Sequence, residues 1–171
     1  HGEMQWVSRI NDALAADRFV LYCQPVAPLK DGCRRHCEIL VRMLDQQGEL
    51  VPPMAFIPAA ERYNLMPAID RWVIRHAFDI IGRCEHNKRD PNCAVYNINL
   101  SGASLSDDGF AEYVLEQLDE SRVPAASVCF EITETAAIAN LRQAVDFIGC
   151  VKAKGCRFAL DDFGSGLSSF V

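Results

Sequence analysis

Hydrophobic residues recur along the chain with two periods, an alternation typical of strands and a spacing of three to four residues typical of helices. Alternation or short apolar runs predict strands at residues 19–26, 37–44, 93–100, 127–133 and 156–161. Helical spacing predicts helices at residues 3–16, 55–62, from 67 onward, 110–118 and 141–154. Lys30-Asp31-Gly32 predicts a turn, so the first two strands should pair antiparallel. The later strands and helices alternate, which favours an α/β fold with parallel strands.

Polar residues mark the expected ends of two helices. Asp107 or Asp108 should cap one helix, and Asn140 should cap the next, which Gly155 ends. The buried faces should consist of the apolar residues at helical spacing, Phe110, Val114 and Leu118 in the first helix and Leu141, Val145, Ile148 and Val151 in the second.

Size and charge narrow the class of protein. The chain has 171 residues, 50% of them hydrophobic, which suits one domain over residues 1–171, with residues 1–17 as a helix leading into it. No apolar run approaches the roughly 20 residues that a membrane span needs. The net charge of −6 argues against non-specific binding to nucleic acid, so we expect no DNA partner. It does not exclude a small anion bound through metal ions.

Eight cysteines are present, without the paired Cys-x-x-Cys spacing of a zinc site. Four of them fall in predicted strands and should act as small buried hydrophobes, namely Cys23, Cys93, Cys129 and Cys156. Unpatterned thiols are typical of a reducing compartment. We therefore expect a cytoplasmic domain, which leaves open a membrane anchor elsewhere in the parent protein.

Polar residues recur at equivalent places in the predicted strands. Asn99 and Glu131 are 32 residues apart, and Glu131 and Asp161 are 30 apart, close to the length of one strand–helix unit. A polar side chain inside a parallel strand is costly unless it is paired or binds a metal. In a barrel of such units, the carboxyl ends of the strands hold the active site.

These positions form a candidate metal centre. Glu38, Asn99, Glu131, Asp161 and Asp162 supply four carboxylates and one carboxamide oxygen, hard ligands that select Mg²⁺ or Mn²⁺ over zinc or copper. With the first aspartate bridging, two ions could clamp a phosphate and lower the pKa of a water between them. The aspartate pair, followed by a glycine-rich stretch, also fits a plain turn that closes a strand.

Arg42 shares a strand face with Glu38 and could hold a phosphate oxygen by a bidentate contact. Glu134 follows Glu131 by three residues and could orient a ligand or a partner lysine. Three alternatives stay open: a Glu38–Arg42 ion pair that only fixes the strand, a helix-opening acid at Glu134, and turn-forming roles for Asn97 and Asn99. For Asn97 the turn is favoured over a ligand role. The histidines lack metal-like spacing and are interpreted as surface or satisfied residues, namely His36, His76 and His86.

Motifs along the whole chain resemble those of the EAL domain family of cyclic di-GMP phosphodiesterases. They are Leu21-Tyr22-Cys23-Gln24-Pro25, Glu38-Ile39-Leu40-Val41-Arg42, Phe56-Ile57-Pro58-Ala59-Ala60-Glu61, Asn97-Ile98-Asn99-Leu100-Ser101, Phe130-Glu131-Ile132-Thr133-Glu134 and Asp161-Asp162-Phe163-Gly164-Ser165-Gly166. The resemblance implies a (β/α)₈ TIM-like barrel with an antiparallel first strand, present here through about strand five. It also implies hydrolysis of cyclic di-GMP to the linear dinucleotide by a water that two Mg²⁺ or Mn²⁺ ions activate.

The resemblance also implies residue roles. The metal ligands would be Glu38, Asn99, Glu131, Asp161 and Asp162, the catalytic residues Glu38, Asp161, Asp162 and Glu134, and the substrate-binding residues Gln24 and Arg42. Ile39 replaces the alanine of the signature motif; it stays apolar and lies on the other strand face, so we expect little effect.

The family's catalytic lysine, a further glutamate and a late glutamine follow the aspartate loop, beyond Val171. We therefore expect residues 1–171 by themselves to hydrolyse the substrate poorly. A sensory or diguanylate cyclase domain is expected on the N-terminal side, and a homodimer stays open. The alternative functions are a sensor that binds cyclic di-GMP without cleaving it and, less favoured, a βα-barrel enzyme of other chemistry.

Overall fold

A six-stranded sheet organises residues 2–27, 35–86 and 95–162, the part of the chain that the computed structural model describes. The strands are β1 (Phe19–Val26), β2 (His36–Leu44), β3 (Leu50–Val51), β4 (Val95–Asn99), β5 (Val128–Thr133) and β6 (Arg157–Asp161). Their order is β1-β2-β4-β5-β6, and β3 pairs with β2 outside this path. As predicted, β1 is antiparallel to β2, and β2, β4, β5 and β6 are parallel to one another.

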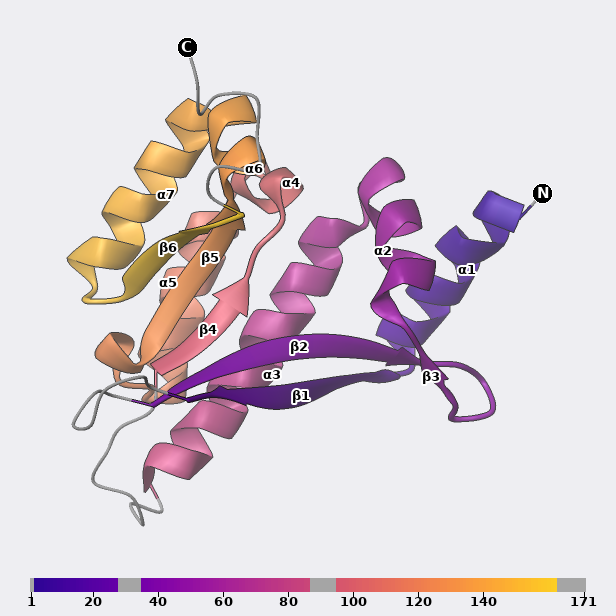
Figure 1. The fold of residues 1–171 in the computed structure, drawn as a ribbon, viewed down its shortest axis with the longest axis horizontal. Helices are drawn as coiled ribbons and strands as arrows, with labels where there is room; N and C mark the ends of the chain where they lie inside the picture. Colours follow the sequence, from indigo (N-terminus) through magenta and orange to yellow (C-terminus); the bar gives the residue numbers. More distant parts are fainter. Residues whose placement is uncertain (1, 28–34, 87–94, 163–171) are drawn as a thin grey trace.

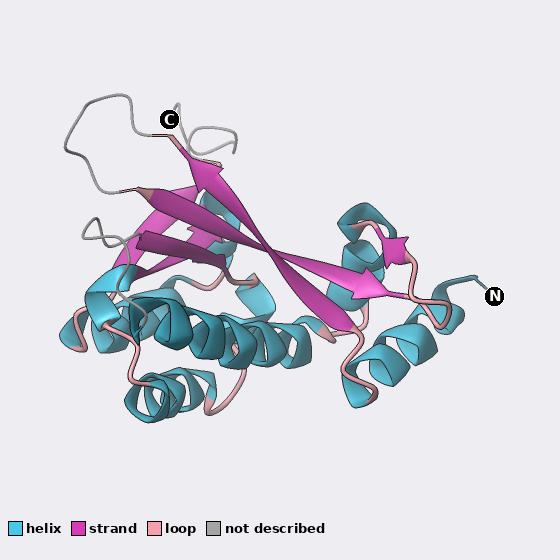
Figure 2. Cartoon of the chain, turned by 90° about the horizontal axis from the view of Figure 1, so that it is seen from below, coloured by secondary structure: helices cyan, strands magenta, loops and turns pink. Residues whose placement is uncertain are grey.

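Helices cover one face of this sheet. They are α1 (Gly2–Ala15), α2 (Pro53–Arg62), α3 (Met66–His86), α4 (Gly102–Leu105), α5 (Phe110–Ser121), α6 (Glu134–Ala139) and α7 (Leu141–Ala153), with a short 3₁₀ helix at Ala125–Ser127. In Figure 1, α1 and α2 lie at the end of the β1–β2 hairpin that is far from β6. Figure 2 shows the sheet above and the long helices below it. No described helix has the length and apolar character needed to span a membrane.

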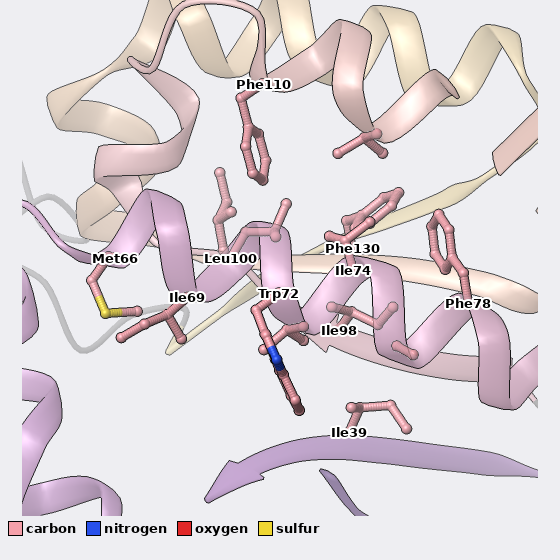
Figure 3. Close-up of a cluster of buried hydrophobic side chains, with 14 of the residues drawn as sticks. Ile39, Met66, Ile69, Trp72, Ile74, Phe78, Ile98, Leu100, Phe110 and Phe130 are labelled. Atoms are coloured by element: carbon pink, nitrogen blue, oxygen red, sulfur yellow. The ribbon is translucent and has the colours of Figure 1, made fainter. Parts of the chain in front are cut away.

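The core lies between the sheet and these helices (Figure 3). Ile39, Ile98 and Phe130 are buried on this face of β2, β4 and β5. The ring of Phe78 lies 6.5 Å from that of Phe130, and the ring of Phe147 meets Phe130 edge-on at 5.6 Å. Burying each such side chain stabilises the fold by roughly 1.5–3 kcal/mol. Because side chains alternate along a strand, the neighbours of these residues in the sequence project from the opposite face.

The predicted N-cap at Asp107 or Asp108 is wrong, whereas Asn140 and Gly155 lie at the two predicted ends of α7. Gly109, with a φ of 75°, occupies the N-cap position of α5, and Asp107 instead accepts a hydrogen bond from Arg71 of α3. Asn140 lies at the N-cap position of α7, but its side chain does not cap the helix. Its amide oxygen accepts a hydrogen bond from Ser106, so this residue connects α4 to α7. In both cases a tertiary contact takes the side chain that local sequence rules assign to a cap.

The buried face of α7 also differs from the predicted face. Leu141 and Val145 are 63% and 58% exposed, and of the predicted set only Val151 is fully buried. Ala144 and Phe147 face the core instead. The sequence of α7 has apolar residues in two helical phases, and packing of the larger Phe147 ring against Phe130 selects one of them.

Three short elements were not predicted. β3 and the first residue of α2, Pro53, lie in what we expected to be a loop at residues 45–53. α4 and α6 have four and six residues, too few for a hydrophobic period to become visible. The predicted turn at Lys30-Asp31-Gly32 lies outside the described residues.

The four cysteines that were predicted to be buried have three different outcomes. Cys129 and Cys156 are buried, as predicted, and burial raises the pKa of each thiol to about 11. The prediction of a buried thiol is wrong for Cys23, which is exposed and forms a disulfide with Cys37 across the β1–β2 hairpin. Sequence spacing could not reveal this pair, because the hairpin register brings the two residues together. Cys93 lies outside the described residues.

Candidate functional site

Four strands carry the predicted ligands to the sheet face opposite the helices. Glu38, Asn99, Glu131 and Asp161 project there because their apolar neighbours on each strand face the core. Asn99 lies level with Glu131 in the β4–β5 register, and Gln24 of β1 lies level with Glu38 of β2. The prediction that these residues share a face is therefore confirmed.

Asn99 contacts the neighbouring predicted ligand directly. Its Nδ2 donates a hydrogen bond of 3.0 Å to Oε1 of Glu38, across β4 and β2. Because the nitrogen makes this contact, the amide oxygen is the atom that would bind a cation. Glu38 is half-buried and Asn99 is exposed.

Asn97 does not form a turn, which was the favoured interpretation of this residue. It lies inside β4, where its Nδ2 donates a hydrogen bond of 2.7 Å to Oε1 of Glu131. Its Oδ1 lies 3.2 Å from Nδ1 of His36. This contact confirms the interpretation of His36 as a satisfied residue.

Glu131 has the perturbed carboxyl group of the site. Burial raises the pKa of Glu131 above its ordinary value, and the nearby carboxylates of Asp161 and Glu38 raise it further. The hydrogen bond from Asn97 and the proximity of His36 act in the opposite direction. Three acidic side chains are thus close enough to repel one another, and a positive charge among them would relieve that repulsion.

The donor set fits a hard divalent cation in its chemistry, since it consists of carboxylate and amide oxygens. The electrostatic coupling of Glu131 to Glu38 and Asp161 supports this fit. Within the described residues, however, no three His, Cys, Asp or Glu side chains stand together at metal-binding distance.

The aspartate pair lies at the end of β6. Oδ1 of Asp161 accepts a hydrogen bond of 2.9 Å from the backbone N–H of Asp162. Asp162 has a φ of 53°, a left-handed conformation that aspartate tolerates better than most residues. Both residues are exposed, so solvent reaches their carboxylates. The glycines that follow lie outside the described residues.

Glu134 is the first residue of α6, directly after the Thr133 N-cap, whose Oγ1 accepts a hydrogen bond of 3.2 Å from the N–H of Ala136. An acid in the first helical turn is stabilised by the helix dipole, so the interpretation of Glu134 as a helix-opening acid is confirmed. Glu131 belongs to β5 and does not share that role.

Arg42 lies on the site face near the end of β2. Its Nη1 donates a hydrogen bond of 2.8 Å to the carbonyl of Val41, and its guanidinium carbon lies 5.7 Å from the centre of the Tyr22 ring. The ion pairs seen among the described residues do not join Arg42 to Glu38. The structure therefore gives no support to the alternative that these two residues only fix the strand.

Sequence reasoning missed two features that support the site. One is the hydrogen bond between Asn97 and Glu131, and the other is the buried carboxylate of Asp70. Asp70 of α3 is 3% exposed and lies among the buried residues of that helix. An acid within an apolar helical stripe was the available signal, because such a group needs buried partners.

Comparison with known proteins identifies the family. The model of the EAL domain matches residues 7–171, so the chain belongs to the EAL domain family. It is 40% identical over 167 residues to the cyclic di-GMP phosphodiesterase PdeB of Shewanella oneidensis. The aligned region covers 97% of this chain and 19% of that protein. It is 32% identical over 165 residues to the cyclic di-GMP phosphodiesterase PdeF of Escherichia coli. Here the aligned region covers 96% of this chain and 21% of that protein.

Among solved structures, the FimX EAL domain from Pseudomonas aeruginosa bound to c-di-GMP matches with a TM-score of 0.85 and 31% identity, over 95% of this chain and 64% of that chain. This match confirms the predicted α/β barrel-like fold, of which the chain carries a part. The chain spans about a fifth of the length of the curated relatives that it matches.

Proposed function

We propose that the protein containing this chain hydrolyses one phosphodiester bond of cyclic di-GMP to give the linear dinucleotide, using two Mg²⁺ or Mn²⁺ ions. The observation that carries the proposal is the gathering of Glu38, Asn99, Glu131 and Asp161 on one sheet face, where burial and then the neighbouring carboxylates raise the pKa of Glu131. The names of the relatives PdeB and PdeF support the substrate.

Each residue of the site has a proposed role. Glu38, Asn99, Glu131 and Asp161 hold the ions, with Asp162 completing the second position. When bound, the ions act as Lewis acids on the phosphate and lower the pKa of a water. The guanidinium of Arg42 binds a phosphate oxygen, next to the Tyr22 ring that packs against it.

Two residues complete the proposed arrangement. Gln24, level with Glu38 on the neighbouring strand, holds the substrate beside the metal ligands. Glu134, at the start of α6, orients a ligand or a partner lysine. A cytoplasmic location, a sensory or diguanylate cyclase domain on the N-terminal side, and a homodimer remain predictions.

A sensor that binds cyclic di-GMP without cleaving it is the second candidate. The observation in its favour is that the described acidic side chains do not form a closed metal-binding group. The oxygen-rich donor set favours the enzyme, because a sensor has no need for a shell of metal-binding carboxylates. Detection of the linear product decides between the two functions.

The experiment uses the protein that contains residues 1–171, purified and incubated with Mn²⁺ and cyclic di-GMP. We expect linear dinucleotide from the wild type and a rate lower by several orders of magnitude for Asp161→Asn, which loses a carboxylate charge that would hold the ions. Asp79→Asn is the matched control, because Asp79 is exposed on α3 and pairs with Arg83 in the same helix. Binding without product would establish the sensor, and an active Asp161→Asn variant would refute the proposed site.

A further inference from the structure

The two asparagines of β4 contact two different glutamates. β4 lies between β2 and β5 in the sheet. Asn99 donates to Glu38 on β2, whereas Asn97 donates to Glu131 on β5. The central strand therefore holds a carboxylate on each side by an amide N–H.

The Asn97–Glu131 contact is the shorter of the two, at 2.7 Å against 3.0 Å for Asn99 and Glu38. Both Asn97 and Glu131 are half-buried, so water competes less for this hydrogen bond than at an exposed site. The contact occupies Oε1 of Glu131, which leaves Oε2 as the oxygen that a cation would take.

The Glu131 carboxylate fixes the direction in which the Asn97 amide faces, because a carboxylate can only accept and therefore takes the amide nitrogen. The oxygen end of the amide then lies 3.2 Å from Nδ1 of His36. A reversed amide would direct its oxygen at a carboxylate. The three side chains thus form one hydrogen-bonded chain from β2 through β4 to β5.

We propose that Asn97, which also contacts His36, is a positioning residue that holds the Glu131 carboxylate in place for a divalent cation. This inference rests on the proposed function for the identity of the site, but it concerns cation affinity rather than turnover. Side chains that hydrogen-bond to metal ligands determine ligand orientation, and their loss typically weakens metal binding about 10–100-fold.

The test measures binding of Mn²⁺ alone, by calorimetric titration of the full protein without substrate. We expect Asn97→Ala to raise the dissociation constant for Mn²⁺ about tenfold or more. Asn140→Ala is the matched control, because this half-buried asparagine also makes two side-chain hydrogen bonds, to Ser106 and Ala136, outside the site. The control should lose comparable thermal stability and keep the wild-type affinity for Mn²⁺.

A second pair of variants tests the role of His36. His36→Gln keeps an N–H donor and should retain most of the affinity for Mn²⁺, whereas His36→Ala should lose several-fold. This pair keeps the inference testable if Asn97→Ala does not fold. In the activity assay, Asn97→Ala should raise the Mn²⁺ concentration needed for half-maximal rate, with the KM for cyclic di-GMP at saturating Mn²⁺ unchanged.

Two results would overturn the inference: an affinity for Mn²⁺ in Asn97→Ala within twofold of the wild type, or an equal loss in Asn140→Ala. A wild-type protein that binds Mn²⁺ but forms no product would refute the proposed function and leave this inference standing. A wild-type protein that does not bind Mn²⁺ would refute both.

Discussion

Asp70 and Ser101 join α3 to the segment that directly follows β4. Oδ2 of Asp70 accepts hydrogen bonds from the backbone N–H of Ser101 at 2.9 Å and from its hydroxyl at 2.7 Å. The hydroxyl of Ser104 donates to the same oxygen at 2.6 Å. Burial raises the pKa of Asp70, although these hydrogen bonds act against the shift. Because Ser101 lies two residues after Asn99, this buried carboxylate fixes the end of the central strand of the site.

We predict that Asp70→Ala lowers the free energy of unfolding by about 3 kcal/mol or more, since it leaves three donors without their acceptor. Asp79→Ala is the control on the same helix, because Asp79 is exposed and makes an i,i+4 pair with Arg83 worth roughly 0.3–0.5 kcal/mol. Urea unfolding of both variants provides the measurement. Equal stability losses would show that the Asp70 contacts contribute no more than a surface ion pair.

The strands of the site could be predicted because a period of two is a local property. Asn99, Glu131 and Asp161 recur at equivalent places in successive strand–helix units, which groups them with Glu38 as candidate ligands, and the register places all four on one face. The contacts that support this face could not be predicted in the same way. Asp70 lies 31 residues from Ser101, and such a pairing depends on how α3 packs against the sheet.

The phase of α7 shows the same limit. Its sequence allows two apolar faces, and only the position of Phe130 decides that Phe147 rather than Val145 is buried. Helix ends were equally dependent on tertiary structure, since Gly109 begins α5 and leaves Asp107 for the contact with Arg71. Local rules therefore identified the elements, and packing determined their faces and caps.

Gly82 allows a close approach of α3 to the end of α5. A Cβ atom at this position would lie 2.8 Å from the carbonyl oxygen of Ser121, a backbone atom that cannot move easily. We predict that Gly82→Ala lowers the free energy of unfolding by roughly 1–2 kcal/mol. Gly149→Ala in α7 is the control, because nothing lies within 4 Å of its added Cβ, and it should stabilise the protein by about 0.5–1 kcal/mol. Denaturant titration that ranks the two variants the other way would contradict this packing.

The stability of the metal-free protein should depend on pH through Glu131. The pKa of Glu131 is raised from 4.5, its ordinary value, by burial and by the carboxylates of Asp161 and Glu38. The folded state therefore retains a proton that the unfolded state releases. The resulting stabilisation is complete below about pH 4.5 and is lost as the pH rises through the raised value in the folded state.

The measurement is the free energy of unfolding in chelator as a function of pH, compared between wild type and Glu131→Gln. The variant should lack this fall in stability, because its side chain does not ionise. Glu112→Gln, an exposed change of the same kind on α5, should keep the wild-type profile. Parallel profiles for wild type and Glu131→Gln would mean that Glu131 is not repelled by its neighbours.

Arg42 should act on substrate affinity rather than on stability. The side chain is half-buried, its guanidinium lies 5.7 Å from the centre of the Tyr22 ring, and it donates to the Val41 carbonyl, so it is held on the site face before substrate binds. We predict that Arg42→Ala weakens binding of cyclic di-GMP by roughly 1.5–3 kcal/mol, the value of a charge-assisted hydrogen bond. Arg42→Lys should restore only part of the loss, because an ammonium group cannot make two parallel contacts with a phosphate.

Arg83→Ala, on the exposed side of α3, is the control and should bind normally. The dissociation constant and the thermal midpoint of each variant separate the two roles: normal binding together with a marked loss of stability in Arg42→Ala would make this arginine a structural residue.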